Sequence, residues 1–277
     1  MNMKKWGLFL ISAILTVSIV GCGSNSNGSG EGAQGGASEG EQVIKFATDA
    51  NYAPMEYMDK DKIVGFDIDF LAAVMEEAGL PYEVANTGWD TMLASVRQGT
   101  EYQAGISSVS ITEDRKASYD YTIPYFESTN MIMVKEGSDI QSALDLEGKK
   151  VAVQGGTTAD IIVSELFGQN NPNISRFDSN TVALMELDKG GADAVVADNA
   201  IVGEYIKNNP TKHFIGITDV ENFGSEFYAI LLPKGSELKA KLDPAIKTVI
   251  ENGKYAEIYE KWFGETPDIT VLQEAAE

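Results

Sequence analysis

The chain has 277 residues, a formal net charge of −21 and a single cysteine. This acidic excess, with no basic stripe, argues against nucleic acid as a partner. A lone cysteine excludes a disulfide within the chain. We expect no metal and no cofactor, because the sequence has no cluster of histidines and cysteines and His213 is its only histidine.

The N-terminus has the features of a lipoprotein signal. An apolar stretch over residues 6–20 follows Lys4 and Lys5 and ends at Gly21-Cys22. It is shorter than a typical membrane span but suits the core of a signal peptide. The Gly21-Cys22 junction resembles a bacterial lipobox, which implies cleavage before Cys22 and lipid attachment to its thiol. The alternative is an uncleaved signal anchor with an idle cysteine.

We therefore expect a signal peptide over 1–21 and a lipidated, flexible tether over 22–42, whose small and polar residues bury little. The globular part runs from about 43 to 264, long enough for two modest domains. We expect no second membrane segment. Residues 265–277 are expected to form a tail, whose acidic end at 273–277 has no apolar anchor.

Apolar runs of strand and helix type alternate along the globular part. We expect strands at 43–48, 82–85, 102–106, 151–154, 174–177, 194–197 and 226–232, and extended segments at 121–126 and 130–135. Helices are expected at 66–78, 91–98, 159–167, 181–189, 200–207, 236–251 and 255–262, with a bend near Pro244. Two βα series predict an α/β protein with mainly parallel sheets, each covered by helices on both faces.

The stretch Ser107-Ser108-Val109-Ser110-Ile111-Thr112-Glu113-Asp114-Arg115 is the strongest candidate for a binding site. It gathers hydroxyls, backbone N–H groups and one guanidinium between an apolar strand and a first helical turn. A guanidinium offers a planar fork that matches a carboxylate, so the stretch suits a small anion. An ordinary serine-rich loop with one surface arginine is an equal alternative.

Other polar and aromatic residues follow strand ends, where open α/β folds place ligand contacts. Asp49 and Tyr52 come directly after the first strand. Asp67 is a candidate contact, but its position at the start of a helix favours an N-cap role. Trp89 precedes a helix and is either the wall of a ligand slot or a core anchor.

Together these pieces resemble the extracytoplasmic amino-acid-binding proteins of ABC importers, which have the type II periplasmic-binding-protein fold. The matching motifs, in chain order, are Ala47-Thr48-Asp49 with Tyr52-Ala53-Pro54, Val64-Gly65-Phe66-Asp67-Ile68-Asp69, Ser107 to Arg115, Pro124-Tyr125-Phe126, Gly156-Thr157-Thr158, Asp193-Ala194-Val195 with Asp198, and Tyr259-Glu260-Lys261-Trp262-Phe263-Gly264.

The resemblance implies two lobes, each a mainly parallel sheet flanked by helices, joined by two crossing strands. Lobe 1 would comprise 43–130 and 231–264, and lobe 2 would comprise 131–230. Hinge strands would lie near 131–135 and 226–230, as two parallel crossings with the cleft between them.

The resemblance also implies a place for each end of a free amino acid. Arg115 would pair with the ligand's α-carboxylate, helped by hydroxyls and N–H groups at Ser108, Ser110 and Thr158. Asp198, from the second lobe, would accept the α-ammonium. Because a zwitterion taken from water loses the hydration of two charges, each end needs a full partner.

The side chain of the ligand would lie between Tyr52 and Trp89, with Asp49 and Gln154 at its far end. An acid between aromatic faces suits a guanidinium or an ammonium. The hydroxyl-rich run from Ser107 to Ser110 also resembles the lysine/arginine/ornithine-binding members. Some glutamine binders carry a lysine at the position of Gln154 and a histidine at the position of Ala197, so both residues of this chain argue against glutamine. We therefore expect a basic amino acid, with glutamine or another polar one as the alternative.

The implied protein is a monomeric, membrane-anchored, extracytoplasmic binding protein that delivers its ligand to an ABC permease with its ATPase. Two other classes remain open. One is a dehydratase-like enzyme on the same fold, which the remote His213 does not favour. The other is a tethered sensor that reports to a receptor.

Overall fold

The first of two large sheets has five strands and is built around the N-terminal strand of the globular part. The computed structural model describes residues 43–276, so the predicted signal peptide, Cys22 and tether lie outside the described residues. The strand order is β5 (Tyr82–Asn86), β1 (Ile44–Thr48), β6 (Ala104–Gly105), β14 (Leu231–Pro233) and β7 (Tyr119–Tyr121). Only β14 runs against the others, because it pairs antiparallel with both β6 and β7.

The second sheet has six strands, five of which lie in one row. Its order is β10 (Ile174–Phe177), β9 (Val151–Gln154), β11 (Ala194–Asp198), β8 (Phe126–Lys135) and β12 (Phe214–Thr218). β9 lies parallel to β10 and β11, whereas β8 runs antiparallel to β11 and β12. In the first sheet four strands run one way and one runs back. In the second, with β13 (Ser225–Tyr228) on β8 counted, five run one way and β8 runs back. This confirms the predicted two-lobe α/β fold with mainly parallel sheets.

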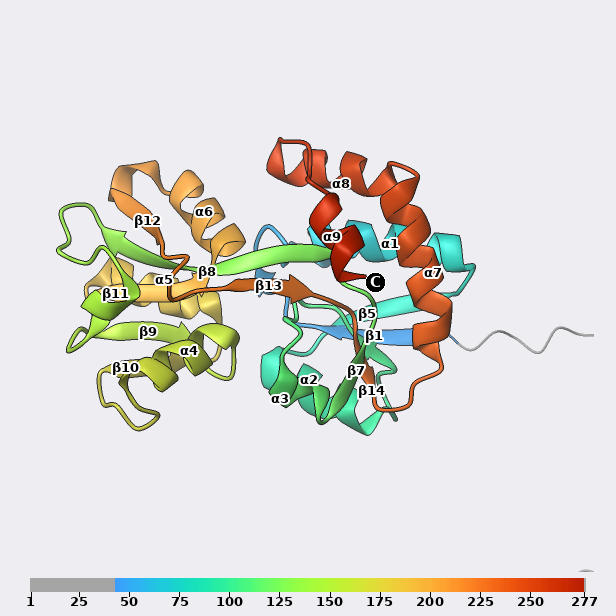
Figure 1. Ribbon diagram of the computed structural model, residues 1–277, viewed down its shortest axis with the longest axis horizontal. Coiled ribbons are helices and arrows are strands. Elements are labelled where there is room, and N and C mark those ends of the chain that lie inside the picture. Colours follow the sequence, from blue (N-terminus) through green and yellow to red (C-terminus); the bar gives the residue numbers. More distant parts are fainter. Residues whose placement is uncertain (1–42, 277) are drawn as a thin grey trace, which may run out of the picture. The chain divides into compact units, whose positions relative to one another are not determined.

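Two strands carry the chain between the sheets, side by side in Figure 1. The first four residues of β8 pair with β13 (Ser225–Tyr228), from Phe126↔Tyr228 to Thr129↔Ser225. The rest of β8 enters the second sheet, and the chain after β13 enters the first sheet as β14. The pairing is antiparallel, so the expectation of two parallel crossings was wrong. A chain that crosses once outward and once back runs in opposite directions on the two passes.

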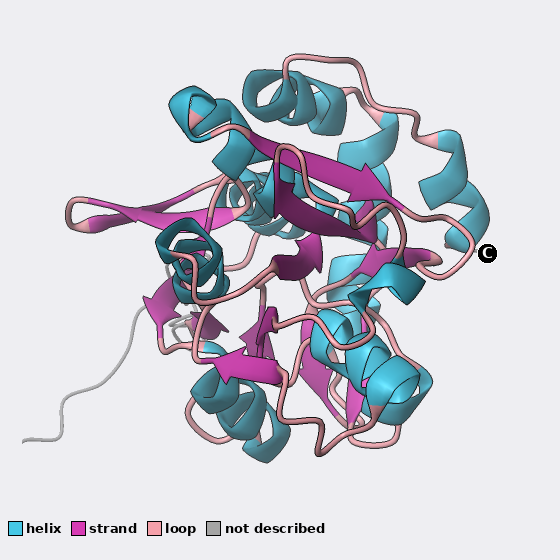
Figure 2. Ribbon diagram, turned by 90° about the vertical axis from the view of Figure 1, so that its left-hand side faces the viewer, coloured by secondary structure: helices cyan, strands magenta, loops and turns pink. Residues whose placement is uncertain are grey.

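Helices cover both faces of each sheet (Figure 2). The first sheet carries α1 (Phe66–Ala78), α2 (Trp89–Gln98), α7 (Leu238–Glu251) and α8 (Lys254–Phe263), and the second carries α4 (Thr158–Phe167), α5 (Asn180–Lys189) and α6 (Asn199–Asn208). Side chains of β11 alternate between two buried clusters: Val195 and Ala197 face one, Ala194 and Val196 the other. Burial on both faces explains the continuous apolar runs of these strands.

The sequence pattern missed some elements. A small antiparallel sheet is formed by β2 (Asn51–Tyr52), β3 (Glu56–Asp59) and β4 (Lys62–Val64), whose polar residues hide the strand pattern. β12 and the short helices α3 (Glu113–Lys116), η1 (Ala143–Leu146), η2 (Pro210–Lys212) and α9 (Thr270–Ala275) complete the described chain.

The expected strand at 226–232 is divided into β13 and β14. The N–H of Ala229 donates to Val109 O and that of Ile230 to Thr122 Oγ1, so other segments interrupt the ladder. The C-terminal tail also differs from expectation, because α9 is anchored through Leu272, which is 3% exposed. Within residues 43–276, no helix is long and apolar enough to cross a membrane.

Candidate functional site

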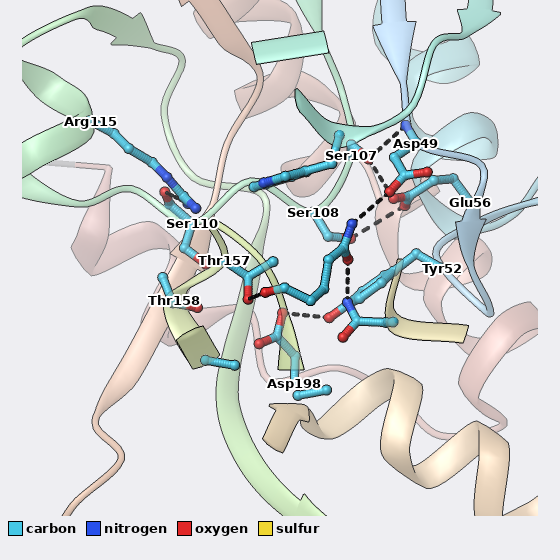
Figure 3. A pocket seen from close by; sticks show the side chains of 15 residues that line it. Asp49, Tyr52, Glu56, Ser107, Ser108, Ser110, Arg115, Thr157, Thr158 and Asp198 are labelled. Atoms are coloured by element: carbon cyan, nitrogen blue, oxygen red, sulfur yellow. Dashed lines mark hydrogen bonds between the residues drawn. The ribbon is translucent and has the colours of Figure 1, made fainter. Parts of the chain in front are cut away.

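A pocket lies where the carboxyl ends of β1, β6, β9 and β11 meet (Figure 3). This is the usual ligand position in open α/β folds. The space left between its walls is about 20 Å³, room for a water rather than an amino acid. The lining residues are Asp49, Tyr52, Glu56, Trp89, Ser107, Ser108, Ser110, Arg115, Gln154, Thr157, Thr158, Ala159, Asn180, Ala197 and Asp198.

Ten of the eleven residues expected to bind ligand line this pocket; the exception is Asp67. The expected N-cap role of Asp67 was wrong, since Gly65 caps α1 and no side chain does so. Asp67 is fully buried and accepts the N–H of Ser108 at 2.8 Å and the hydroxyl of Tyr125 at 2.8 Å. Ser108 has a left-handed φ of 48°, which is strained for a residue with a side chain. Asp67 therefore stabilises the loop over residues 107–110, the serine loop, in this conformation.

Arg115 lies at one end of the pocket, on α3, and is 9% exposed. Its Nη1 donates to Ser110 O at 3.0 Å and its Nη2 to Gly156 O, in the other lobe, at 3.0 Å. Its Cζ lies 5.2 Å from the ring centroid of Trp89, a cation–π contact. Burial lowers the pKa of Arg115, yet a guanidinium stays charged in proteins. The site thus holds one fixed positive charge.

Trp89 fills both roles left open by the sequence. It lines the pocket, and it also belongs to a buried cluster with Met92 and Val96 of its own helix. Its indole lies against Gly156, where a Cβ would approach Nε1 to 3.5 Å. Gly156 also has a φ of 72°, so a side chain there would be strained as well as close to the ring.

Asp198 ends β11 and provides the acid of the second lobe. The hydroxyls of Tyr52 and Tyr228 both donate to its Oδ2, each at 2.5 Å. Removal from water raises the pKa of Asp198, and these two hydrogen bonds act in the opposite direction by favouring the carboxylate. Tyr52 was expected to stack on a ligand side chain, but here its hydroxyl bridges the lobes.

Asp49 lies at the other end of the pocket and is 5% exposed. The amide of Gln154 reaches across from the second lobe, donating through Nε2 to Asp49 Oδ2 at 2.9 Å. Asn180 Nδ2 in turn donates to Gln154 Oε1 at 2.7 Å. Gln154 therefore holds the position that the far end of a ligand was expected to take.

Glu56 is a pocket residue that the sequence interpretation missed. It is 1% exposed and accepts the hydroxyls of Ser107 at 2.7 Å and Ser108 at 3.4 Å. Burial raises its pKa well above the usual range, and the charge of Asp67 raises it further. Its place on β3 could not be predicted because that strand was not recognised.

Glu226, on β13, was also missed. Its Oε2 accepts the hydroxyls of Ser110 at 2.5 Å and Thr158 at 2.8 Å, and its Oε1 accepts Asn130 Nδ2 at 2.5 Å. Ser110 and Thr158 were expected to serve a ligand carboxylate. The signal in the sequence was an acid at the start of an apolar strand returning to the first lobe.

Residues 44–265 match the model of the bacterial extracellular solute-binding proteins, family 3. A probable histidine-binding protein of Neisseria gonorrhoeae is 38% identical over 95% of this chain and 97% of its own length. The arginine-binding extracellular protein ArtP of Bacillus subtilis is 31% identical over 94% of this chain and 98% of its own.

A solved structure gives the same result. The arginine-, lysine-, histidine-binding protein ArtJ of Geobacillus stearothermophilus superposes with a TM-score of 0.82 at 52% identity, covering 84% of this chain and all of the other. The family match spans both sheets and every residue of the pocket. The resemblance inferred from the motifs is therefore confirmed: this chain belongs to the bacterial extracellular solute-binding proteins of family 3.

Proposed function

We propose that this protein captures a free basic amino acid, arginine or lysine, in the pocket between its lobes. The observation that carries the proposal is the charge of the lining: one guanidinium, Arg115, against the acids Asp49, Glu56 and Asp198. Even with a proton on Glu56, the acids exceed the base. An acidic lining complements a ligand of net positive charge better than a neutral zwitterion.

The groups are arranged to meet three charges on one small molecule. Arg115 would bind the α-carboxylate, Asp198 the α-ammonium and Asp49 the side-chain cation, with Trp89 as an apolar wall. Charge-assisted hydrogen bonds contribute about 1.5–3 kcal/mol each. Micromolar affinity requires about 8 kcal/mol. A few such bonds therefore suffice, even after the cost of ordering the lobes.

Ligand entry would require the lobes to part and the Gln154 amide to leave Asp49. We propose that lobe 1 comprises 43–130 and 231–264, that lobe 2 comprises 131–230, and that they turn about the paired β8 and β13 strands. A ligand that touches both lobes stabilises the closed state because it adds contacts that exist only when the lobes are together. The relatives described above are named as binding proteins for histidine, arginine or lysine, which supports the choice of a basic ligand.

We further propose that the protein is a monomer outside the cytoplasm, anchored through lipid on Cys22, and that it delivers its ligand to an ABC permease with its ATPase. Its role would be binding without turnover. Conversion of prephenate or arogenate by the purified protein would contradict this, and unchanged amino-acid uptake on deletion would favour a sensor.

Titration calorimetry with arginine, lysine, histidine, glutamine, glutamate and cystine tests the ligand class. We expect arginine or lysine to bind most tightly. Tight binding of glutamine or glutamate, with no heat from arginine or lysine, would exclude the basic ligand.

A further inference from the structure

Glu226 lies on the crossing strand β13 and is hydrogen bonded to three other segments. Ser110 reaches it from the serine loop of the first lobe, Thr158 from the start of α4 in the second, and Asn130 from β8. Both hydroxyls donate to the same oxygen, Oε2. The Glu226 carboxylate thus accepts the two hydroxyls that were expected to donate to the ligand's carboxylate.

A hydroxyl has one proton, so it donates one hydrogen bond at a time. While Ser110 and Thr158 donate to Glu226, neither can donate to a second carboxylate. A ligand carboxylate arriving beside Arg115 would also meet the negative charge of Glu226 in a partly buried space, where like charges repel strongly. Both obstacles disappear when Glu226 carries a proton, because its O–H donates to one hydroxyl oxygen and frees that hydroxyl's proton for the ligand.

We propose that Glu226 is a proton-taking gate of the carboxylate subsite, so that binding of the ligand's carboxylate is coupled to uptake of one proton by Glu226. The inference rests on the proposed function of the pocket. In the coupled step an O–H bond forms on Glu226 with a proton from solvent. This O–H donates to one of the two hydroxyls, Ser110 or Thr158, and that hydroxyl then donates to the ligand instead of to Glu226.

The surroundings of Glu226 suit such a gate. Its pKa is raised to about 7, first by burial and then by the charge of Asp198 at the end of β11. The hydroxyl bonds of Ser110 and Thr158 and the charge of Arg115 on α3 act in the opposite direction. A second anion at Arg115 would offset the effect of that guanidinium and raise the pKa further. The proton is therefore taken up at and above neutral pH.

Calorimetric titration with arginine at pH 8, in buffers of different ionisation enthalpy, counts the protons taken up. A group with a pKa of about 7 is about 10% protonated at pH 8, so complete gating takes up roughly 0.9 of a proton. The affinity should also fall, by up to about tenfold per pH unit, as pH rises above 7.

The variant Glu226→Gln keeps the size of the side chain and permanently offers an N–H to the hydroxyls. It should bind arginine with an affinity that changes less than about twofold between pH 7 and 8, and with its proton count lower by roughly 0.9. Because the ligand ammonium and Glu56 also titrate, the difference between the two proteins on the same ligand is the decisive quantity. Glu127→Gln is the matched control, since Glu127 lies on the paired strand β8 but is exposed. It should behave as wild type.

Equal proton counts in wild type and Glu226→Gln, with binding intact, would overturn the gate and leave the proposed function standing. If Glu226→Gln does not fold, the wild type decides alone: no proton uptake and no loss of affinity between pH 7 and 8 would also overturn the gate. No binding of any amino acid at pH 6 or 8 would overturn the proposed function and the gate together.

Discussion

Replacing Asp49 by asparagine tests whether the pocket selects a cation. The change keeps the volume and the ability to accept from Asn51 Nδ2, which donates to Asp49 Oδ1 at 2.9 Å, but removes the charge. A hydrogen bond to a charged group contributes about 1.5–3 kcal/mol, which corresponds to a loss of roughly 10- to 150-fold in affinity. Arginine binding should weaken by that factor, whereas glutamine binding should change by less than about threefold, because glutamine presents no charge to Asp49.

Titration calorimetry of Asp49→Asn with both ligands measures the two losses. Asp90→Asn is the matched control, because Asp90 lies beside Trp89 in the same lobe but is exposed and outside the pocket. Equal losses for arginine and glutamine, or no loss for arginine, would refute the assignment of Asp49 to a side-chain cation.

Three further predictions concern pH and stability. Acidification should weaken ligand binding because Asp198, whose pKa is raised, becomes protonated as pH falls. Tyr52→Phe removes one hydrogen bond that stabilises the carboxylate, so this loss of affinity should begin at a higher pH when Kd is measured from pH 7 to pH 4. An unchanged profile of Kd against pH would contradict the role of that hydroxyl. Phe66 is fully buried among aromatic rings, so Phe66→Ala should lower the free energy of unfolding by about 3–5 kcal/mol, measured by urea denaturation. A loss below about 1 kcal/mol would contradict its core role. Burial raises the pKa of Asp67 to about 6, above the ordinary value of about 4, so its ionisation reduces the stability of the fold as pH rises from about 4 to about 6. Asp67→Asn should remove this pH dependence of Tm. An unaltered slope of Tm against pH would show that another group causes it.

Strongly periodic elements were predictable from sequence because one residue pattern decided them. The strands Val151–Gln154 and Ile174–Phe177 lie within the expected bounds, and α1 runs over the expected 66–78. The small β2–β3–β4 sheet was not predictable, since its strands are short and polar. Local sequence patterns also could not predict that the chain returns to the first sheet, because β14 pairs with strands more than a hundred residues earlier.

The same limit applies to the site. Asp49 and Ser110 could be expected at one edge because parallel strands of one sheet deliver them there. Asp198 ends a strand of the other sheet, so its place in the same pocket could be expected only from the family resemblance. Glu56 and Glu226 could not, since their places depend on an unrecognised strand and on the crossing of β13. Nor could the sequence show that Asp67 would support the serine loop, because that role depends on the left-handed turn at Ser108.

The most direct test of the central claim is a crystal structure of the protein with arginine. We predict the α-carboxylate within hydrogen-bond distance of Arg115, the α-ammonium at Asp198 and the guanidinium at Asp49, with the Gln154 amide displaced. Arginine bound in the reverse orientation, or bound outside the pocket, would contradict the account.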